Sequence, residues 1–358
     1  PADPKPEPKR DLPEPVEPPS APAPSAARAP KAWLLSSAKD FAPGDVDGVT
    51  LDPQGTLLLA AGRAEVARWA EPHLFAADTD RAGVTWLGGG TTAELLRLSG
   101  DRLSMAWKGD DPLVTAVCAT TGGVLFATAP SGIVRRLDAQ GKVSQVADVG
   151  AAYVWQLRAA RDGSVLAVTG RPSRLLRLRG DQVTELAKFD LDHALCVAEA
   201  PNGTLYVAGG APGRVLAVDG ARSSVVATAS EPITALAVGA DGTVYFGHGN
   251  TLSAVADGQR RQLGAFVGFR VLGIVPTPTG LLVSAGLRSD SEAALFSVNP
   301  ANGEAQVLFD DKLAAITALV PQSDSSFLAV GDAPARIYRL SLPTVLRGSY
   351  LSPVLDAG

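Results

Sequence analysis

A short phrase recurs along this chain at intervals close to 40 residues, and this repeat constrains the fold more than any other feature of the sequence. The phrase is a turn, an apolar strand and a glycine run, as in "NGTLYVAGG" (202–210). Successive opening glycines are 40, 40, 40, 39 and 38 residues apart. They are Gly83, Gly123, Gly163, Gly203, Gly242 and Gly280, with Ser325 in the same place in a seventh copy. Self-similarity at this period predicts a repeat architecture in which each copy is one structural unit.

Each unit contains four strand signals, which in the fourth unit are residues 194–200, 204–210, 214–220 and 223–229. Asn-Gly and Asp-Gly pairs between them favour the tight turns of antiparallel hairpins. Four antiparallel strands in 40 residues are typical of one propeller blade. The sequence therefore predicts an all-β fold, a seven-bladed β-propeller of four-stranded antiparallel blades.

The two ends of the repeat predict how the ring closes. The last copy lacks a fourth strand after "RIYRLSL" (336–342), and "AEVARWA" (64–70) stands where a fourth strand ends in the other copies. We expect this N-terminal strand, about 64–70, to complete the last blade and remove an exposed edge. An eight-bladed ring is the alternative, because "GVTLDPQGTLLLAAG" (48–62) mimics the start of a blade. Only one further strand follows it, so we place it outside the ring, where it can pair with "GSYLSPVLDAG" (348–358).

Two neighbouring columns of the first strands differ in side-chain size. Small residues are expected where strands crowd around the axis, and larger ones where blades pack face to face. The small column is Ala76, Ala116, Gln156, Cys196, Ala235, Gly273 and Ala318. The larger column is Ala77, Val117, Leu157, Val197, Leu236, Ile274 and Leu319.

The chain outside the repeats has a different composition. Residues 1–31 hold 11 of the 27 prolines, and this composition predicts a disordered Pro-rich linker. Such tethers often follow a secretion signal or membrane anchor, so we expect export, to the periplasm, the cell surface or the medium. A Pro-rich ligand for a peptide-binding module is the alternative. The remaining divisions are an extension with a strand hairpin (32–63), the propeller (64–345) and a C-terminal segment that starts a further domain (346–358).

Charge and cysteine content exclude several classes. The net charge of −5 argues against nucleic acid and anionic membrane surfaces, which need a basic footprint. No run of 18 apolar residues occurs, so no transmembrane segment is expected in this chain. Cys118 and Cys196 fall in strands of non-adjacent repeats and are expected as buried thiols without a disulfide.

The stretch "YVWQLRAARDGSVLAVTGRPSRLLRL" (153–178) resembles blades of secreted bacterial propellers of the NHL, WD40-like and two-component-regulator types. "GSYLSPVLDAG" (348–358) resembles the exit from such propellers into a further β-sandwich domain. The resemblance covers residues 33 to 358. Because propellers of these types have many different functions, it implies the fold and no particular activity. The Trp-Asp pair that closes WD40 blades and the tryptophan-docking pattern of quinoprotein propellers are both missing.

Motifs for catalysis are scarce. The sequence has no Gly-x-Ser-x-Gly nucleophile turn, no phosphate-binding loop and no His-Glu-x-x-His zinc helix, so no cofactor is expected. His73 and His193 begin the first strands of blades 1 and 4, and His248 lies between the second and third strands of blade 5. Three imidazoles on one face can hold a metal. Blades 1 and 4 are nearly opposite, however, so rim histidines are the favoured interpretation.

The same face collects aromatic and arginine side chains. Aromatic rings give large contact areas with few rotors, and arginine pairs with carboxylates through two parallel hydrogen bonds. The candidate ligand-binding face is Tyr153, Trp155, Arg171, His193, His248 and Arg270, with Phe269 and Arg288 nearby. In the alternative interpretation Trp155 plugs the channel and the arginines only confer solubility. The arginines of the third-strand column, expected as a solvated outer stripe, are Arg97, Arg136, Arg177 and Arg339.

Three hypotheses of function follow. The first is a non-enzymatic exported scaffold that binds a protein, peptide or glycan on its funnel face. The second is a metal-dependent propeller lyase or lactonase with His73, His193 or His248 as ligand or base. The third is a structural module of a larger envelope assembly.

Overall fold

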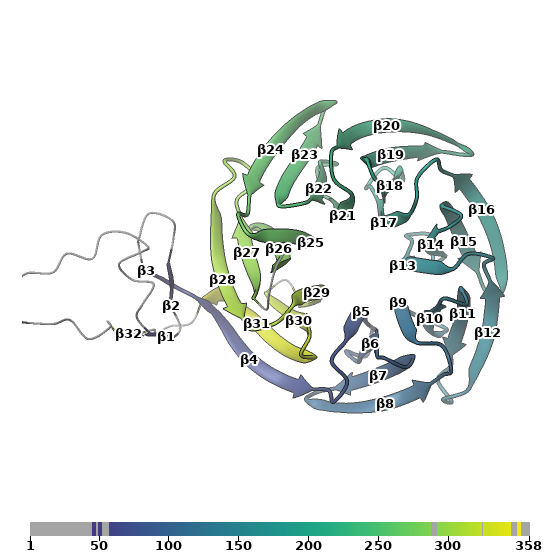
Figure 1. The fold of residues 1–358 in the computed structure, drawn as a ribbon, viewed down its shortest axis with the longest axis horizontal. Coiled ribbons are helices and arrows are strands. Elements are labelled where there is room, and N and C mark those ends of the chain that lie inside the picture. The colour runs from purple at the N-terminus through teal and green to yellow at the C-terminus, as the bar shows by residue number, and fades with distance from the viewer. Residues whose placement is uncertain are drawn as a thin grey trace, which may run out of the picture. The chain divides into compact units, whose positions relative to one another are not determined.

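The computed structural model describes residues 45–47, 49–51, 57–287, 292–323, 325–344 and 349–351, all within one compact unit. Seven four-stranded antiparallel sheets are arranged in a ring around a central opening (Figure 1). No helix occurs among the described residues, and hence none that is long and apolar enough to cross a membrane. The chain is a seven-bladed β-propeller, as the repeat predicts.

Within each blade the strands follow one another from the axis outward. Blades 1 to 3 are β5 (Leu74–Thr79), β6 (Thr85–Gly89), β7 (Glu94–Ser99), β8 (Arg102–Lys108); β9 (Leu113–Thr120), β10 (Gly123–Ala129), β11 (Ile133–Leu137), β12 (Val143–Asp148); and β13 (Tyr153–Ala159), β14 (Val165–Gly170), β15 (Arg174–Arg179), β16 (Gln182–Lys188). Blades 4 and 5 are β17 (Ala194–Glu199), β18 (Leu205–Gly209), β19 (Gly213–Asp219), β20 (Arg222–Ala229); and β21 (Ile233–Val238), β22 (Val244–His248), β23 (Thr251–Ala256), β24 (Gln259–Ala265). Blades 6 and 7 are β25 (Phe269–Thr277), β26 (Gly280–Leu287), β27 (Ala293–Val298), β28 (Ala305–Asp311); and β29 (Ala315–Ser323), β30 (Ser326–Asp332), β31 (Arg336–Thr344), β4 (Ala61–Arg68).

The ring closes through β4, which pairs antiparallel with β31 and supplies the outer strand of blade 7 (Figure 1). The strand begins at Ala61 rather than at residue 64 and ends at Arg68. Trp69 lies beyond the strand, where its indole N–H donates to Glu94 Oε2 at 2.8 Å. The closing strand therefore begins three residues before the predicted start. The reason is that its pairing with β31 continues past a bulge as far as the Thr344–Ala61 pair.

Two short pairings involve residues outside the seven blades. β2 (Val49–Leu51) pairs with β3 (Leu57–Leu59), and β1 (Asp45–Asp47) pairs with β32 (Ser349–Leu351). The predicted partnership between the N-terminal extension and the C-terminal segment is thus made by β1 and not by the 48–62 hairpin. The linker (1–31) lies outside the described residues, as does the C-terminal segment except for β32.

The recurring phrase is the turn into the second strand of each blade. In blade 4, Gly203 has φ = 86°, a left-handed conformation that glycine adopts without strain. Its N–H donates to the carbonyl of Ala200 at 2.9 Å, and Asn202 Oδ1 accepts from the Thr204 N–H at 3.0 Å. This local chemistry explains why glycine recurs with the period of the blade.

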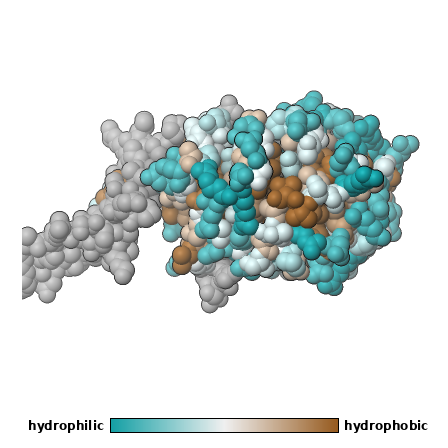
Figure 2. All heavy atoms as spheres, turned by 90° about the horizontal axis from the view of Figure 1, so that it is seen from above, coloured by the Kyte–Doolittle hydropathy of each residue, from teal (hydrophilic) through white to brown (hydrophobic). Residues whose placement is uncertain are grey.

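Seven hydrophobic clusters hold the ring together, one between each pair of neighbouring blades. Each cluster includes one residue of the larger column, such as Leu157 between blades 2 and 3 or Leu236 between blades 4 and 5. Members of the small column, among them Ala116, Cys196 and Ala235, also belong to these clusters, so the two columns are not divided between the axis and the blade junctions as the size pattern predicts. Seen edge-on, much of the outer rim carries hydrophilic side chains around a smaller hydrophobic area (Figure 2).

Every first strand carries a β-bulge at the same position. In β13, Val154 pairs with Thr169 and Gln156 pairs with Val168, so Trp155 has no cross-strand partner. A bulge bends its strand and redirects the extra side chain. The extra residues all line the central channel and are Phe75, Thr115, Trp155, Leu195, Thr234, Leu272 and Thr317.

Three of these bulge residues are threonines that connect neighbouring blades. Thr115 Oγ1 donates to the carbonyl of Val154 at 2.7 Å, and Thr234 Oγ1 donates to that of Val271 at 2.6 Å. Thr317 Oγ1 donates to the carbonyl of Leu74 at 2.7 Å, across the junction between blades 7 and 1. Each acceptor directly precedes the bulge of the next blade.

Thr115→Val is expected to lower the free energy of unfolding by about 1–3 kcal/mol, because it leaves the buried Val154 carbonyl without its donor. The measurement is urea denaturation followed by circular dichroism. Thr228→Val, at an exposed position on β20, is the matched control and should change stability by less than about 0.5 kcal/mol. Equal effects of the two changes would contradict a connecting role for the Thr115 hydroxyl.

Candidate functional site at the channel mouth

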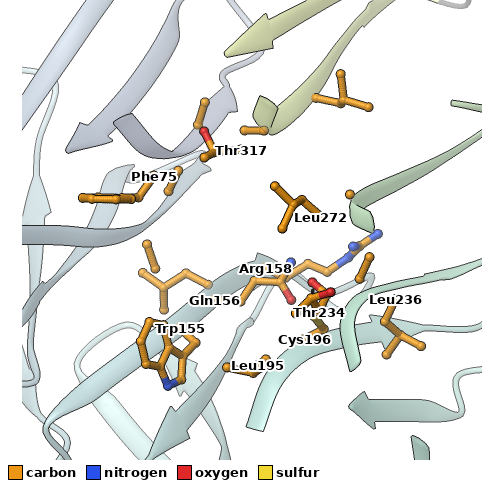
Figure 3. Close-up of a pocket in the computed structure, with 18 of the residues that line it drawn as sticks. Phe75, Trp155, Gln156, Arg158, Leu195, Cys196, Thr234, Leu236, Leu272 and Thr317 are labelled. Carbon is orange, nitrogen blue, oxygen red and sulfur yellow. Dashed lines mark hydrogen bonds between the residues drawn. The ribbon is translucent and has the colours of Figure 1, made fainter. Parts of the chain in front are cut away.

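The first strands of all seven blades surround a central cavity of about 290 Å³ (Figure 3). The seven residues of the small column all line it, as predicted. Because the strands of a blade alternate in direction, the starts of the first strands and the turns between second and third strands share one face of the ring. We call this face the mouth. It includes the starts of β13 and β17 and the turn after β14.

Three aromatic side chains of blades 3 and 4 meet at the mouth. Tyr153 stacks on Trp155, with ring centroids 4.8 Å apart and planes inclined by 11°. His193 meets Trp155 edge-on at 5.4 Å and lies 5.9 Å from Tyr153. We call these three residues the aromatic cluster. It combines rigid apolar area with polar edges, the composition that protein recognition sites favour.

The hydrogen bond within the cluster determines which ring nitrogen of His193 carries the proton. Trp155 Nε1 lies 2.9 Å from His193 Nδ1. Since an indole N–H only donates, Nδ1 accepts, and the proton of the neutral ring is on Nε2. Burial, together with the positive charge of Arg171, lowers the pKa of His193. Asp192 acts in the opposite direction. His193 is therefore a neutral imidazole at neutral pH.

Acidification is expected to destabilise the protein through His193. Its pKa is lower in the folded protein than the ordinary 6.5, so the unfolded chain binds the proton more readily. The stabilisation is complete above about pH 6.5 and is lost as the pH falls from there through the folded-state pKa. The imidazole titration followed by NMR should give a pKa below 6.5. His193→Gln keeps an acceptor for Trp155, and its melting temperature should fall less than that of the wild type between about pH 7 and about pH 5. Equal decreases in melting temperature for the two proteins would contradict a contribution of His193 to the pH dependence of stability.

Gly170, which is not among the residues of the predicted ligand-binding face, makes room for the aromatic cluster. It ends β14 and forms an isolated bridge with His193. A Cβ atom at this position would lie 1.9 Å from His193 Nδ1 and 2.6 Å from Trp155 Nε1. Only a residue without a side chain fits beneath this hydrogen bond. The sequence feature that could have pointed to Gly170 is its place at the end of the second strand, directly before Arg171 and Pro172.

Arg171 stands beside the cluster on the turn after β14. It is exposed and has φ = 56°, a conformation that residues other than glycine seldom adopt. The turn is held by Thr169, whose Oγ1 donates to the carbonyl of Pro172 at 2.7 Å and accepts from the Arg174 N–H at 3.1 Å. The strained backbone directs a cationic side chain toward solvent next to the aromatic rings.

The structure does not bring every predicted face residue into this cluster. His248 contacts Arg260 at 3.0 Å and stacks on Phe246 at 5.7 Å, in blade 5. Burial and the Arg260 charge lower the pKa of His248. Arg270 is exposed in blade 6, and Phe269 packs edge-on against Phe296 at 5.6 Å. Arg288 lies outside the described residues.

The three histidines have separate environments. His73 Nδ1 lies 3.0 Å from Asp332 Oδ1, so this histidine is engaged across the junction between blades 1 and 7. His193 is engaged with Trp155, and His248 with Arg260. Among the residues that the structure describes, no three or more His, Cys, Asp or Glu side chains gather as a metal site would require.

Three of the four arginines in the outer column form ion pairs, and Arg97 is exposed. Arg136 Nη1 lies 3.2 Å from Asp181 Oδ1, and Arg339 Nη2 lies 2.8 Å from Asp101 Oδ1. Each of these pairs joins one blade to the outer turn of the next. Arg177 pairs with Asp162 within blade 3 at 2.9 Å. The prediction missed the pairs between blades because Asp181 and Asp101 follow turn glycines in neighbouring repeats, far from Arg136 and Arg339 in sequence.

Both cysteines are free and buried, as predicted. Burial raises the pKa of Cys118 and that of Cys196 to about 12 in each case. Both thiols are therefore protonated at neutral pH, and neither is activated as a nucleophile.

No family model matches the sequence, and no curated protein matches it either. Many solved structures are similar in fold. YCF48 bound to D1 peptide has 12% sequence identity and a TM-score of 0.62, over 80% of this chain and 98% of that one. Virginiamycin B lyase from Staphylococcus aureus has 10% identity and a TM-score of 0.63, over 79% and 99%. The extracellular domain of the putative one-component system BT4673 from B. thetaiotaomicron has 13% identity and a TM-score of 0.62, over 80% and 41%. At these identities the likeness is one of fold.

Proposed function

We propose that this chain is a non-enzymatic, exported propeller that binds a peptide segment of a partner protein at the mouth. The observation that carries the proposal is the aromatic cluster of Tyr153, Trp155 and His193 with Arg171 beside it. Stacked rings supply contact area that needs little ordering on binding. The guanidinium of Arg171 is exposed and can pair with a carboxylate or a peptide carbonyl.

Two of the structural neighbours support the proposal. YCF48, a propeller of the same fold, was solved with a peptide bound, and another neighbour is an extracellular domain of a bacterial protein. The Pro-rich residues 1–31 agree with an exported, tethered protein. The lyase among the neighbours favours an enzymatic alternative, but the histidines considered for it, His73, His193 and His248, have separate partners here. Binding without catalysis therefore fits the described residues better.

The proposal is tested by selecting displayed random peptides on the wild-type protein, with a glycan array run in parallel. Trp155→Ala and Arg171→Gln are expected to weaken selected peptides about 30-fold or more, the effect of losing a binding hot spot. Met105→Ala, on the outer strand of blade 1, is the control and should leave affinity unchanged. Binding that is insensitive to Trp155, binding of glycans alone, or turnover that depends on a stoichiometric metal would each overturn the proposal.

A further inference from the structure

We propose that the central channel is a second binding site, which takes a carboxylate through the guanidinium of Arg158. Arg158 lies near the end of β13, three residues beyond Trp155 and therefore about 10 Å deeper along the strand. Figure 3 shows its side chain extending from β13 across the pocket, with Gln156 on the same strand. The site lies deeper in the ring than the aromatic cluster, although Trp155 lines the channel as well, and it does not depend on the mouth binding a peptide.

The guanidinium of Arg158 is unusual because it is enclosed by the ring and yet lacks a direct partner. Its side chain is accessible to solvent through the channel, while protein surrounds it on every side. Among the described residues, no carboxylate lies within 4.0 Å of it and no acceptor is within hydrogen-bond distance. Enclosure lowers the pKa of Arg158, and the charge of Asp78 opposes this. An arginine remains charged under these conditions, so a cation with five free donors points into a confined space.

The neighbouring acids are already engaged elsewhere. Asp78 accepts from the N–H of Thr79 and from that of Ala119, each at 2.9 Å. Glu199 Oε2 accepts from the N–H of Arg161 at 2.9 Å. These carboxylates oppose the attraction of the guanidinium for an anion without occupying its donors. Among the described residues that line the channel, Arg158 carries the one charge, so the lining suits a group with a single negative charge and disfavours a phosphate dianion.

A second donor lies on the same strand. Gln156 Oε1 accepts from the Val197 N–H at 2.7 Å, which assigns the oxygen and leaves the Nε2 amide as a donor. No partner for this NH₂ group occurs among the described residues. The forked donors of Arg158 and the amide of Gln156 together match the two oxygens of a carboxylate.

The size of the channel limits the ligand. A volume of about 290 Å³ is at the lower end for small-molecule sites. It fits a small free carboxylate, or the acidic side chain or chain end of a peptide that enters the ring. These two sources share the same chemistry, and the test separates them.

The probes are propionate, for a free carboxylate with a single charge, and tetraglycine, for a peptide end, with C-terminally amidated tetraglycine as a comparison. Each is titrated at constant ionic strength while the Arg158 Nε–Hε resonance is followed by NMR. We expect a saturable shift with one or both probes and none with the amidated peptide. A shift with propionate alone would assign the site to free carboxylates, and a shift with tetraglycine alone would assign it to peptide ends. No saturable shift at millimolar concentrations of either probe would overturn the proposal.

Substitutions provide the second readout, through ligand-dependent changes in melting temperature. Arg158→Gln is expected to weaken binding of the probes at least tenfold, and Arg158→Lys to restore part of it. Arg97→Gln, an exposed arginine on β7, is the matched control and should bind as the wild type does. Undiminished binding by Arg158→Gln would overturn the proposal. If neither variant folds, the wild-type resonance decides. Peptide binding at Trp155 is measured separately, so failure of either proposal can be distinguished from failure of the other.

Discussion

Deleting residues 1–68, which removes β4, is expected to abolish cooperative folding of the ring. Seven residue pairs join β4 to β31, and Val66 and Ala67 pack against the cluster between blades 7 and 1. At about 0.5–1.5 kcal/mol for each backbone hydrogen bond, together with the lost apolar burial, the deletion costs roughly 5–10 kcal/mol. This is comparable to the whole stability of a typical domain, about 5–15 kcal/mol. The deletion also leaves β31 as an exposed edge.

The matched control is deletion of residues 1–60, which keeps β4 intact. Thermal unfolding by circular dichroism and size-exclusion chromatography compare the two truncations. The shorter deletion should unfold cooperatively near the wild-type temperature, and the longer one should aggregate or show no transition. A longer deletion that folds like the shorter one would contradict the assignment of β4 as the closing strand.

Gly170→Ala is expected to break the aromatic cluster while leaving the ring folded. The added Cβ would stand 1.9 Å from His193 Nδ1, so the Trp155–His193 hydrogen bond could not persist. Overpacking of this kind costs about 1–3 kcal/mol. His193, displaced toward solvent, would lose the burial that lowers its pKa, and that pKa should rise toward 6.5. Affinity for peptides selected at the mouth should fall about as far as in Trp155→Ala.

The control for Gly170→Ala is Gly264→Ala in β24, where a Cβ would meet no atom closer than 3.9 Å. NMR of the Trp155 indole N–H and of the His193 ring provides the measurement. Unchanged indole and imidazole resonances in Gly170→Ala would contradict the tight packing of glycine beneath the cluster.

The architecture could be predicted from the sequence because its determinants are local. A turn residue, which is glycine in six blades and Ser325 in the seventh, and the apolar strand after it recur with every blade, so seven weak signals support one another. The closing strand could also be predicted from the sequence, because the last repeat lacks its fourth strand. The start of this strand at Ala61 could not be predicted, because it depends on a bulge in the pairing with β31.

The site could be predicted only in part, because it depends on contacts between blades. Trp155 and His193 were placed on one face, but their hydrogen bond joins residues 38 positions apart. His248 and Arg270 belong to blades 5 and 6, and the sequence carries no measure of their distance from the cluster. Arg158 was overlooked although a charged residue in an apolar first strand is a visible signal, and strand alternation places it on the same side as Gln156.

The most direct test of the account is a disulfide across the junction that closes the ring. Ala64 and Arg339 are directly paired between β4 and β31, so Ala64→Cys/Arg339→Cys should form an intramolecular bridge under mild oxidation. Arg177 occupies the corresponding third-strand position in blade 3, which makes Ala64→Cys/Arg177→Cys the matched control. Peptide mapping by mass spectrometry should find the 64–339 bridge in monomeric protein and no 64–177 bridge. Free thiols in both variants, or bridges only between molecules, would contradict a ring closed by β4 around one channel.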